Sequence, residues 1–219
     1  IMTTEPKFVP NEAVEITIDK NLKLKTRLVD CVGYLVDNAI GYLEDDMPRM
    51  VKTPWSDEEI PFETAAEIGT KKVIEEHSTI GILITTDGSV TDIPREDYVK
   101  AEERVVSELR ALNKPFIILL NSANPSSPET RELSIQLSDK YNTKVMPINC
   151  ENLTVEDINT MFSNLLYEFP VEEIDINFPK WIDALDFSHP LKSKLFEQLK
   201  DTFSSVSALK DISSCTSKI

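Results

Sequence analysis

The sequence has few of the residues that build disulfide frameworks and zinc sites, with three cysteines and two histidines among 219 residues. Cys31, Cys150 and Cys215 are widely spaced and form no CxxC pair, which favours a reducing compartment such as the cytosol. His77 and His189 are isolated from each other and cannot form a zinc cage alone. A disulfide-stapled secreted fold and a structural zinc module are therefore excluded.

Long apolar runs are also missing. The longest run, from Pro115 to Leu120, has the length of a strand and is far shorter than the ~20 residues that cross a bilayer. The first residues lack the basic segment and apolar stretch that are typical of a secretory signal. We therefore expect no membrane span and no secretory signal in these residues.

Positive charge is scarce, because 23 Lys and Arg stand against 38 Asp and Glu, which gives a net charge of −15. This balance argues against nucleic acid as the main partner, since polyanion binding depends on Lys and Arg. It does not exclude a single nucleotide, which needs only a local site. The 41% apolar content excludes a disordered chain, and the length fits one domain with an appendage.

The N-terminal part predicts a β-hairpin followed by a long loop. Residues 14–18 alternate between apolar and polar, and so do residues 22–30, with a turn at Asp19, Lys20 and Asn21 between them. Residues 34–60 are rich in Asp, Glu and Pro, and we expect a long loop there.

The following segment alternates between helical patterns and short apolar strands, which predicts a parallel sheet covered by helices on both faces. Ligands in such folds bind at the carboxyl ends of the strands. We therefore expect the site after the strands, at residues 30–33, 85–88, 121–124 and 149–151. The expected strands are 79–85, 115–121 and 144–149, and the expected helices are 62–76, 95–112, 128–141 and 154–167, the last with Thr154 as N-cap.

The character of the chain changes beyond Phe169. Residues 171–178 alternate and predict one more, acidic edge strand. Pro179 opens a short helix, residues 191–209 predict one amphipathic helix, and the last residues are expected to be frayed. We divide the chain into a domain of residues 1–178 and a helical segment of residues 179–219 that leads toward a further domain.

The most suggestive motif is Asp30-Cys31-Val32-Gly33 at the end of an expected strand. Asp followed by Gly three residues later is the DxxG arrangement of P-loop NTPases, in which the Asp holds Mg²⁺. Gly33 would let its backbone N–H approach a γ-phosphate. Asp and Gly also end strands and open turns in many other proteins, and this simpler interpretation stays open.

Two further pieces fit the same arrangement. Thr3 and Thr4 precede the first strand, where a first-switch threonine would close over the metal and phosphate, although they could also be ordinary frayed terminal residues. Residues 121–124, Asn-Ser-Ala-Asn, stand where GTPases have the guanine-binding motif Asn-Lys-x-Asp. Ser122 takes the place of the Lys and Asn124 the place of the Asp, so a preference for guanine should be weakened or lost. Asn149 and Cys150 would form the last loop near the base. A polar turn before Pro125 is the alternative interpretation.

One part of the arrangement is not in the sequence, because no GxxxxGK[ST] occurs anywhere. In P-loop NTPases this loop follows a central strand that lies between the strands corresponding to residues 22–30 and 79–85. The first residue is Ile instead of Met, and we expect the printed sequence to begin inside a longer gene. We therefore predict a gap in the sheet there, or direct pairing of these two strands, and poor solubility of the chain alone.

Several segments together resemble the stage IV sporulation protein A family in order along residues 1–185. They are residues 1–10, 27–34, 48–50, 53–55, 60–62, 65–70, 77–81, 85–88, 101–105, 114–117, 121–122, 127–130 and 167–171. The resemblance implies an α/β P-loop NTPase fold, a G-domain-like three-layer sandwich, here truncated at the N-terminus and followed by a helical stub.

The resemblance also implies a function. The family is a group of spore-coat morphogenetic ATPases that bind ATP with Mg²⁺ and polymerise at the forespore surface, in the mother-cell cytoplasm. A small amphipathic membrane peptide and other coat proteins are the implied partners, so that the membrane is reached indirectly. Asp30 matches the metal-binding aspartate, Thr3 and Thr4 the sensor threonines, and Asn121-Ser122 the altered base loop.

Two alternatives stay open. Without a P-loop the chain could be a scaffold that does not hydrolyse nucleotide, and we expect the 219 residues alone to be inactive. A Rossmann-like or flavodoxin-like enzyme is the other alternative, and the lack of GxGxxG counts against its dinucleotide-binding form.

Overall fold

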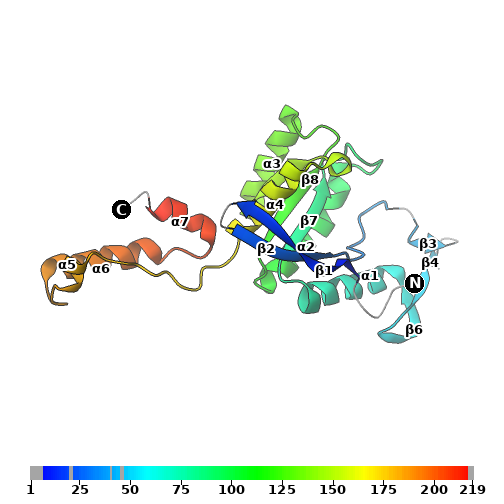
Figure 1. Ribbon diagram of the computed structural model, residues 1–219. Coiled ribbons are helices and arrows are strands. Elements are labelled where there is room, and N and C mark those ends of the chain that lie inside the picture. Colours follow the sequence, from blue (N-terminus) through cyan, green and yellow to red (C-terminus); the bar gives the residue numbers. More distant parts are fainter. Residues whose placement is uncertain (1–6, 20–21, 40, 45–46, 217–219) are drawn as a thin grey trace. The chain divides into compact units, whose positions relative to one another are not determined.

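The computed structural model describes residues 7–19, 22–39, 41–44 and 47–216 (Figure 1). The chain forms two compact units, Ile1–Ser163 and Asn164–Ile219. Each unit is described separately below.

A parallel sheet of three strands forms the centre of the first unit (Figure 1). The strands are β7 (Gly81–Thr86), β8 (Phe116–Asn121) and β9 (Val145–Ile148), with β8 in the middle. The apolar run of β8 is buried from Phe116 to Leu120, as expected of a strand with helices on both faces. The predicted α/β class with a parallel sheet is confirmed.

Helices α2 (Val99–Ala111) and α3 (Pro128–Tyr141) pack on one face of this sheet. Their buried side chains share one apolar core with alternate residues of the strands and with the turn that follows the first helix: Ile74, Val106, Leu109, Phe116, Ile118, Leu120, Leu137, Tyr141 and Val145. Ile117 and Leu119 point to the other face of β8 and are buried as well. Both faces of the central strand are therefore covered.

Local sequence signals fix the helix starts. The Ser127 hydroxyl accepts a hydrogen bond from Thr130 N at the start of α3, and Pro128 occupies the first turn, which is a preferred arrangement for an N-terminus. Helix α4 (Val155–Tyr167) begins with a reciprocal pair, because Thr154 N donates to Asp157 and Asp157 N donates to the Thr154 hydroxyl. The predicted cap at Thr154 is confirmed.

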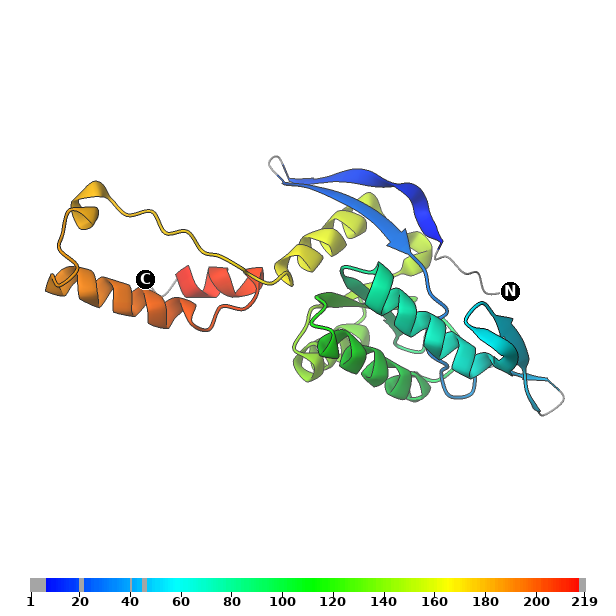
Figure 2. The same ribbon diagram turned by 90° about the horizontal axis from the view of Figure 1, so that it is seen from below.

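Helix α1 (Phe62–Lys72) continues into a π-helical turn, Val73–His77. Lys114, just before β8, caps the C-terminal end of this turn, because its ammonium group donates to the carbonyl oxygens of Ile74 and Ser78. Figure 2 shows α1 and its continuation as the teal helix that lies beside the green helix α2, and Arg104 of α2 forms an ion pair with Glu67 of α1. A short 3-10 turn, Arg95–Tyr98, leads into α2.

The N-terminal hairpin is present, and it forms a sheet of its own. Strand β1 (Phe8–Asp19) pairs antiparallel with β2 (Leu22–Val29). In the described part of the chain, β2 and β7 belong to separate sheets. Direct pairing of these two strands, one of the two predicted outcomes, is therefore not found among the described residues, and a gap in one common sheet stays a prediction.

The prediction of one long loop at residues 34–60 was wrong in part. Four short strands form two hairpins there, β3 (Leu43–Glu44) with β4 (Met47–Pro48), and β5 (Met50–Thr53) with β6 (Ser56–Pro61). Strands of two to six residues with mostly exposed side chains do not produce an apolar alternation, so the sequence gives little signal for them.

The second unit contains helices and an extended segment. Residues 171–178 form no strand, against the prediction, because no strand among the described residues pairs with this extended segment. At its start, an isolated bridge joins Pro170 to Ala208, and Val171 N donates to Ser207 O. Helices α5 (Lys180–Asp183), α6 (Pro190–Phe203) and α7 (Leu209–Thr216) follow.

The single helix predicted over residues 191–209 was wrong, because the chain turns after Phe203 and starts again at Leu209. The Asp211 carboxylate accepts hydrogen bonds from Ser207 N and Ala208 N and so caps the new helix. Cys215 is buried in α7, and the last residues predicted to be frayed, 217–219, lie outside the described residues.

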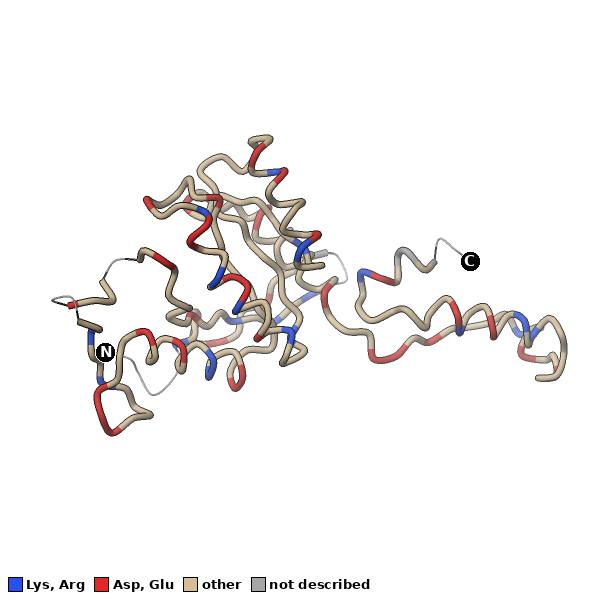
Figure 3. Tube along the Cα trace, turned by 180° about the vertical axis from the view of Figure 1, so that it is seen from behind, with Lys and Arg blue, Asp and Glu red and all other residues tan. Residues whose placement is uncertain are grey.

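Acidic residues are distributed along both units (Figure 3), consistent with the net charge of −15. Among the described residues, no helix has the length and apolarity needed to cross a membrane. The three cysteines are free, as expected from their spacing.

Candidate functional site

The loops that follow β8 and β9 lie against each other at the carboxyl edge of the sheet. The Asn121 side-chain oxygen accepts a hydrogen bond from Cys150 N at 2.9 Å, and Ser122 N donates to Ile148 O at 2.9 Å. The Asn149 amide lies 3.5 Å from the Ala123 carbonyl oxygen. The structure therefore brings Asn121, Asn149 and Cys150 together, as the sequence interpretation required.

Ser122 and Asn124 occupy different environments in the first of these loops. The Ser122 side chain is buried, with 1% of the residue exposed, and its hydroxyl accepts a hydrogen bond from Asn124 N. Asn124 is exposed. The Ser122 side chain therefore stabilises the loop from inside, whereas the side chain of Asn124 is accessible to a ligand.

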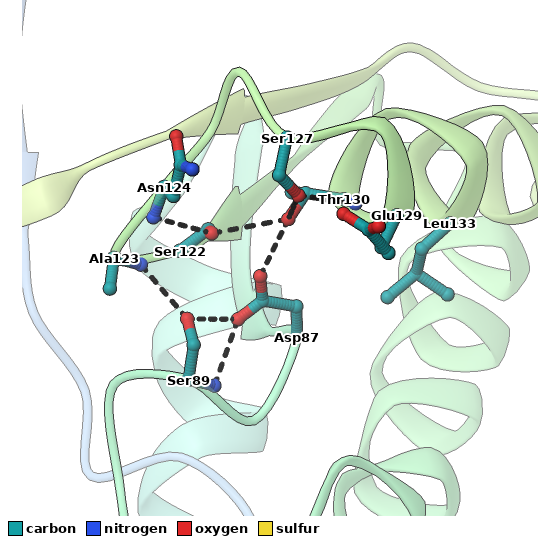
Figure 4. A pocket seen from close by; sticks show the side chains of 9 residues that line it. All are labelled: Asp87, Ser89, Ser122, Ala123, Asn124, Ser127, Glu129, Thr130 and Leu133. Carbon is teal, nitrogen blue, oxygen red and sulfur yellow. Dashed lines mark hydrogen bonds between the residues drawn. The ribbon is translucent and has the colours of Figure 1, made fainter.

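A pocket of about 270 Å³ lies beside this loop, between the loop after β7 and the start of α3 (Figure 4). Its walls carry two carboxylates, an amide and several hydroxyl groups, with one leucine at the side. The lining residues are Asp87, Ser89, Ser122, Ala123, Asn124, Ser127, Glu129, Thr130 and Leu133.

Asp87 is the hydrogen-bond acceptor at the centre of this group. One carboxylate oxygen accepts from Ser89 N at 2.9 Å and from the Ser89 hydroxyl at 2.5 Å, and the other accepts from the Thr130 hydroxyl at 2.8 Å. Burial raises the pKa of the Asp87 carboxyl, but the surrounding hydroxyl groups and the Ser89 backbone N–H lower it by more, so the pKa lies below its usual value. Asp87 is therefore an ionised acceptor near neutral pH.

The loop after β7 contains a glycine in the left-handed conformation. Gly88 has a φ of +89°, and a side chain at this position would approach the Arg95 backbone nitrogen to 3.2 Å. Both conditions favour glycine. Residues 85–88 were predicted as a site position, but Asp87 was not singled out, because its partners Ser89 and Thr130 come from different elements and follow no spacing rule.

The DxxG segment is attached to α1. Asp30 is exposed directly after β2, and Gly33 has a φ of +82°. Gly33 N, which we expected to face a phosphate, donates to the Thr70 hydroxyl at 2.9 Å, and Thr70 is buried with 2% exposed. Thr70 is a partner that the motif did not indicate.

The described residues contain some of the groups that the sequence interpretation assigned to a nucleotide site. They contain no group of three or more His, Cys, Asp or Glu side chains placed to hold a metal ion. The loops at 30–33, 87–94, 121–127 and 149–153 contain no Lys or Arg, the residues that neutralise polyphosphate in such sites. Thr3 and Thr4 lie outside the described residues. Asp30 and Asn124 are exposed after β2 and β8, whereas cationic groups for a phosphate chain would have to come from outside these loops.

Comparison with known proteins decides the family. A family model described as stage IV sporulation protein A, ATPase domain, matches residues 1–170, and one described as the middle domain of the same protein matches residues 171–219. The chain belongs to the stage IV sporulation protein A family. No solved structure gives a significant match.

Curated members of the stage IV sporulation protein A family are similar over nearly the whole chain. Those of Bacillus anthracis, Bacillus subtilis (strain 168) and Clostridioides difficile (strain 630) are 49%, 48% and 50% identical over 212 residues. The match covers 97% of this chain and 43% of each relative, so the chain spans less than half of their length.

The two family models divide the chain after residue 170, and the two compact units divide after Ser163. The loops at the carboxyl edge of the sheet all belong to the ATPase-domain part. The helical segment predicted to lead toward a further domain lies inside the match to the middle domain. The boundary at residues 178 and 179 stays a prediction.

Proposed function

We propose that this chain is part of a sporulation protein that binds and hydrolyses ATP with Mg²⁺ in a P-loop NTPase domain. The observation that carries the proposal is the match of residues 1–170 to the ATPase domain of stage IV sporulation protein A. The loops after β8 and β9, joined through Asn121 and Cys150, supply its base side. The strand that carries the phosphate-binding loop would lie between β2 and β7, which belong to separate sheets among the described residues.

Each predicted residue has a role in this proposal. Asp30 would hold the metal through water, Thr3 and Thr4 would face the γ-phosphate, and Asn124 would face the base. Bound Mg²⁺·ATP supplies the leaving group and the charge neutralisation of the reaction. For Gly33 N to face a phosphate, its hydrogen bond to Thr70 has to open.

The replacement of Asp by Asn at position 124 supports ATP over GTP. A carboxylate accepts two hydrogen bonds from the N–H groups of guanine, whereas an amide presents one acceptor and one donor. Binding of guanine would leave a donor unpaired, which is costly in a desolvated site.

Assembly into the spore coat is the wider part of the proposal. The full-length protein would polymerise into a layer at the forespore surface, in the mother-cell cytoplasm. A small amphipathic membrane peptide would recruit it, and other coat proteins would bind the layer. Family membership supports this part. Sedimentation of the full-length protein with and without ATP tests it, and absence of ATP-dependent large species would refute it.

Hydrolysis is tested by steady-state ATPase assays of the full-length protein and its Asp30→Ala variant. A residue that holds the metal through water contributes about 10- to 100-fold to metal affinity or activity, so we expect a loss of that size. Asp57→Ala is the matched control, because Asp57 is exposed on β6, and it should keep full turnover. Equal turnover of the Asp30 variant and the wild type would refute the metal role, and no turnover in the wild type would favour a scaffold.

A further inference from the structure

We propose that Asp87 is a positioning residue that fixes the backbone of the loop Asn121–Asn124 and thereby sets the affinity of the site for the nucleotide base. This role rests on the proposed function. Asp87 itself lies on the loop after β7 and would act through Ser89 and Thr130.

The first connection runs through Ser89. Its hydroxyl donates to Asp87 at 2.5 Å and accepts a hydrogen bond from Ala123 N at 2.9 Å (Figure 4). Ser89 is also held by its own backbone N–H, which donates to the same carboxylate oxygen at 2.9 Å. The Ala123 amide is therefore attached to the β7 loop through one hydroxyl whose orientation Asp87 determines.

The second connection runs through Thr130 and Ser122. The Thr130 hydroxyl donates to the other oxygen of Asp87 at 2.8 Å and lies 3.3 Å from the Ser122 hydroxyl. The Ser122 hydroxyl accepts a hydrogen bond from Asn124 N at 3.0 Å. Thr130 and Ser122 are buried, with 4% and 1% exposed, so water has little access to this branch.

The direction of the hydrogen bonds shows why a carboxylate stands at this position. Each serine accepts from a backbone N–H of the loop and has its own proton left to donate. A carboxylate is an acceptor at both oxygens and can receive the protons of both branches. An asparagine at position 87 has only one side-chain oxygen that can accept. Its NH₂ group would face the hydroxyl of Ser89 or of Thr130, each of which donates its proton toward position 87.

The consequence lies at Asn124. Its side chain is exposed at the carboxyl edge of the sheet, where α/β folds bind ligands. Two consecutive N–H groups, of Ala123 and Asn124, are fixed by the two branches. Without the hydrogen bonds of the two branches, the loop could sample other conformations. The Asn124 side-chain amide would then spend less time in the position that contacts the base.

The experiment combines two measurements on the full-length protein and its Asp87→Asn variant. Residue-resolved amide hydrogen exchange follows Ala123 and Asn124, and steady-state kinetics follow ATP. One hydrogen bond is worth roughly a fivefold to tenfold change in an opening equilibrium. We expect exchange at both amides to accelerate by about that factor. We also expect KM for ATP to rise with kcat retained, as when binding common to the ground and transition states is lost.

Three further variants locate the effect. Ser89→Ala should accelerate exchange at Ala123 and leave Asn124 close to wild type. Thr130→Val should do the reverse. Asp92→Asn is the matched control, because Asp92 is exposed on the same loop, and it should change neither exchange nor KM. Since Ser89 is exposed, its variant should fold even if the Asp87 variant does not.

The results separate the two parts of the proposal. Unchanged exchange at both amides in the Asp87 and Ser89 variants would overturn the positioning role. Faster exchange with unchanged KM, or with a loss confined to kcat, would overturn the effect on base affinity. If the wild type neither binds nor hydrolyses ATP, the proposed function and the effect on base affinity fail together, while exchange still decides the positioning of the loop.

Discussion

Removal of the buried Glu102 carboxylate should destabilise the first unit more than any surface change. Glu102 lies on α2 with 3% of the residue exposed. It forms an ion pair with Arg95 at 2.8 Å and accepts a hydrogen bond from the Tyr141 hydroxyl at 2.7 Å. These contacts join α2 to the turn that precedes it and to α3. Glu102→Ala would leave the Arg95 charge and the Tyr141 hydroxyl without their partner.

The magnitude follows from the burial of the three groups. Removing one partner of a buried ion pair costs about 3–5 kcal/mol, because the remaining charge is left uncompensated. The Arg95 side chain is 17% exposed and can recover some hydration, so we expect a loss near 3 kcal/mol in the free energy of unfolding. Tyr141→Phe removes one hydrogen bond to a charged group and should cost about 1.5–3 kcal/mol. Lys100→Ala is the control, because its ion pair with Asp37 is exposed, and it should leave stability unchanged.

The assay is urea unfolding followed by tryptophan fluorescence in a Trp181→Phe background. Trp181 is exposed in the second unit, and its removal leaves Trp55 as a reporter beside α1 in the first unit. Glu102→Ala should lower the urea midpoint without a large change of slope. An equal midpoint for Glu102→Ala and the Lys100 control would refute the assignment of this ion pair as a structural anchor.

Three further changes test other parts of the fold. At Gly81 a Cβ atom would lie 2.9 Å from a leucine methyl group of α2, so Gly81→Ala should cost about 1–3 kcal/mol of unfolding free energy; Gly69→Ala, where the nearest atom is at 3.5 Å, should cost nothing. Burial, then the hydrogen bond to its buried carboxylate partner, raises the pKa of Tyr141 to about 12. An unfolded tyrosine loses its proton near pH 10, so the contribution of protonated Tyr141 to the free energy of unfolding is complete below pH 10 and is lost as the pH rises through 12. The urea midpoint of Tyr141→Phe should therefore decline less than that of the wild type between pH 10 and 12. An equal decline of the two proteins would contradict the argument. Thr70→Val removes the acceptor of Gly33 N and should accelerate amide exchange at that glycine, whereas Thr70→Ser should not.

The sheet and its helices were predictable because their signals are local. The β8 strand is a continuous apolar run, and its flanks contain turn residues. Helix α3 has Ser127 and Pro128 at its start and Asn142 in the left-handed conformation after its end, so both bounds could be derived from the sequence. The hairpins of residues 43–61 were missed because pairs of such short strands depend on the turn between them.

Residues 171–178 show the limit of alternation as a signal. They alternate as a strand does, but a strand forms only when a neighbouring strand offers its hydrogen-bonding groups. The candidate site shows a similar limit. The loops after the strands could be predicted from topology, whereas the hydroxyl groups that connect Asp87 to Ala123 and Asn124 come from three separate elements. Only the folded structure brings them together.

The central claim is that a nucleotide binds at the carboxyl edge of this sheet. It is tested most directly by amide hydrogen exchange of the full-length protein with and without Mg²⁺·ATP. The account predicts added protection at residues 30–33, 121–124 and 149–151, and none at the β3–β4 hairpin. Protection confined to other parts of the chain, or no change at these three loops under saturating ATP, would contradict it.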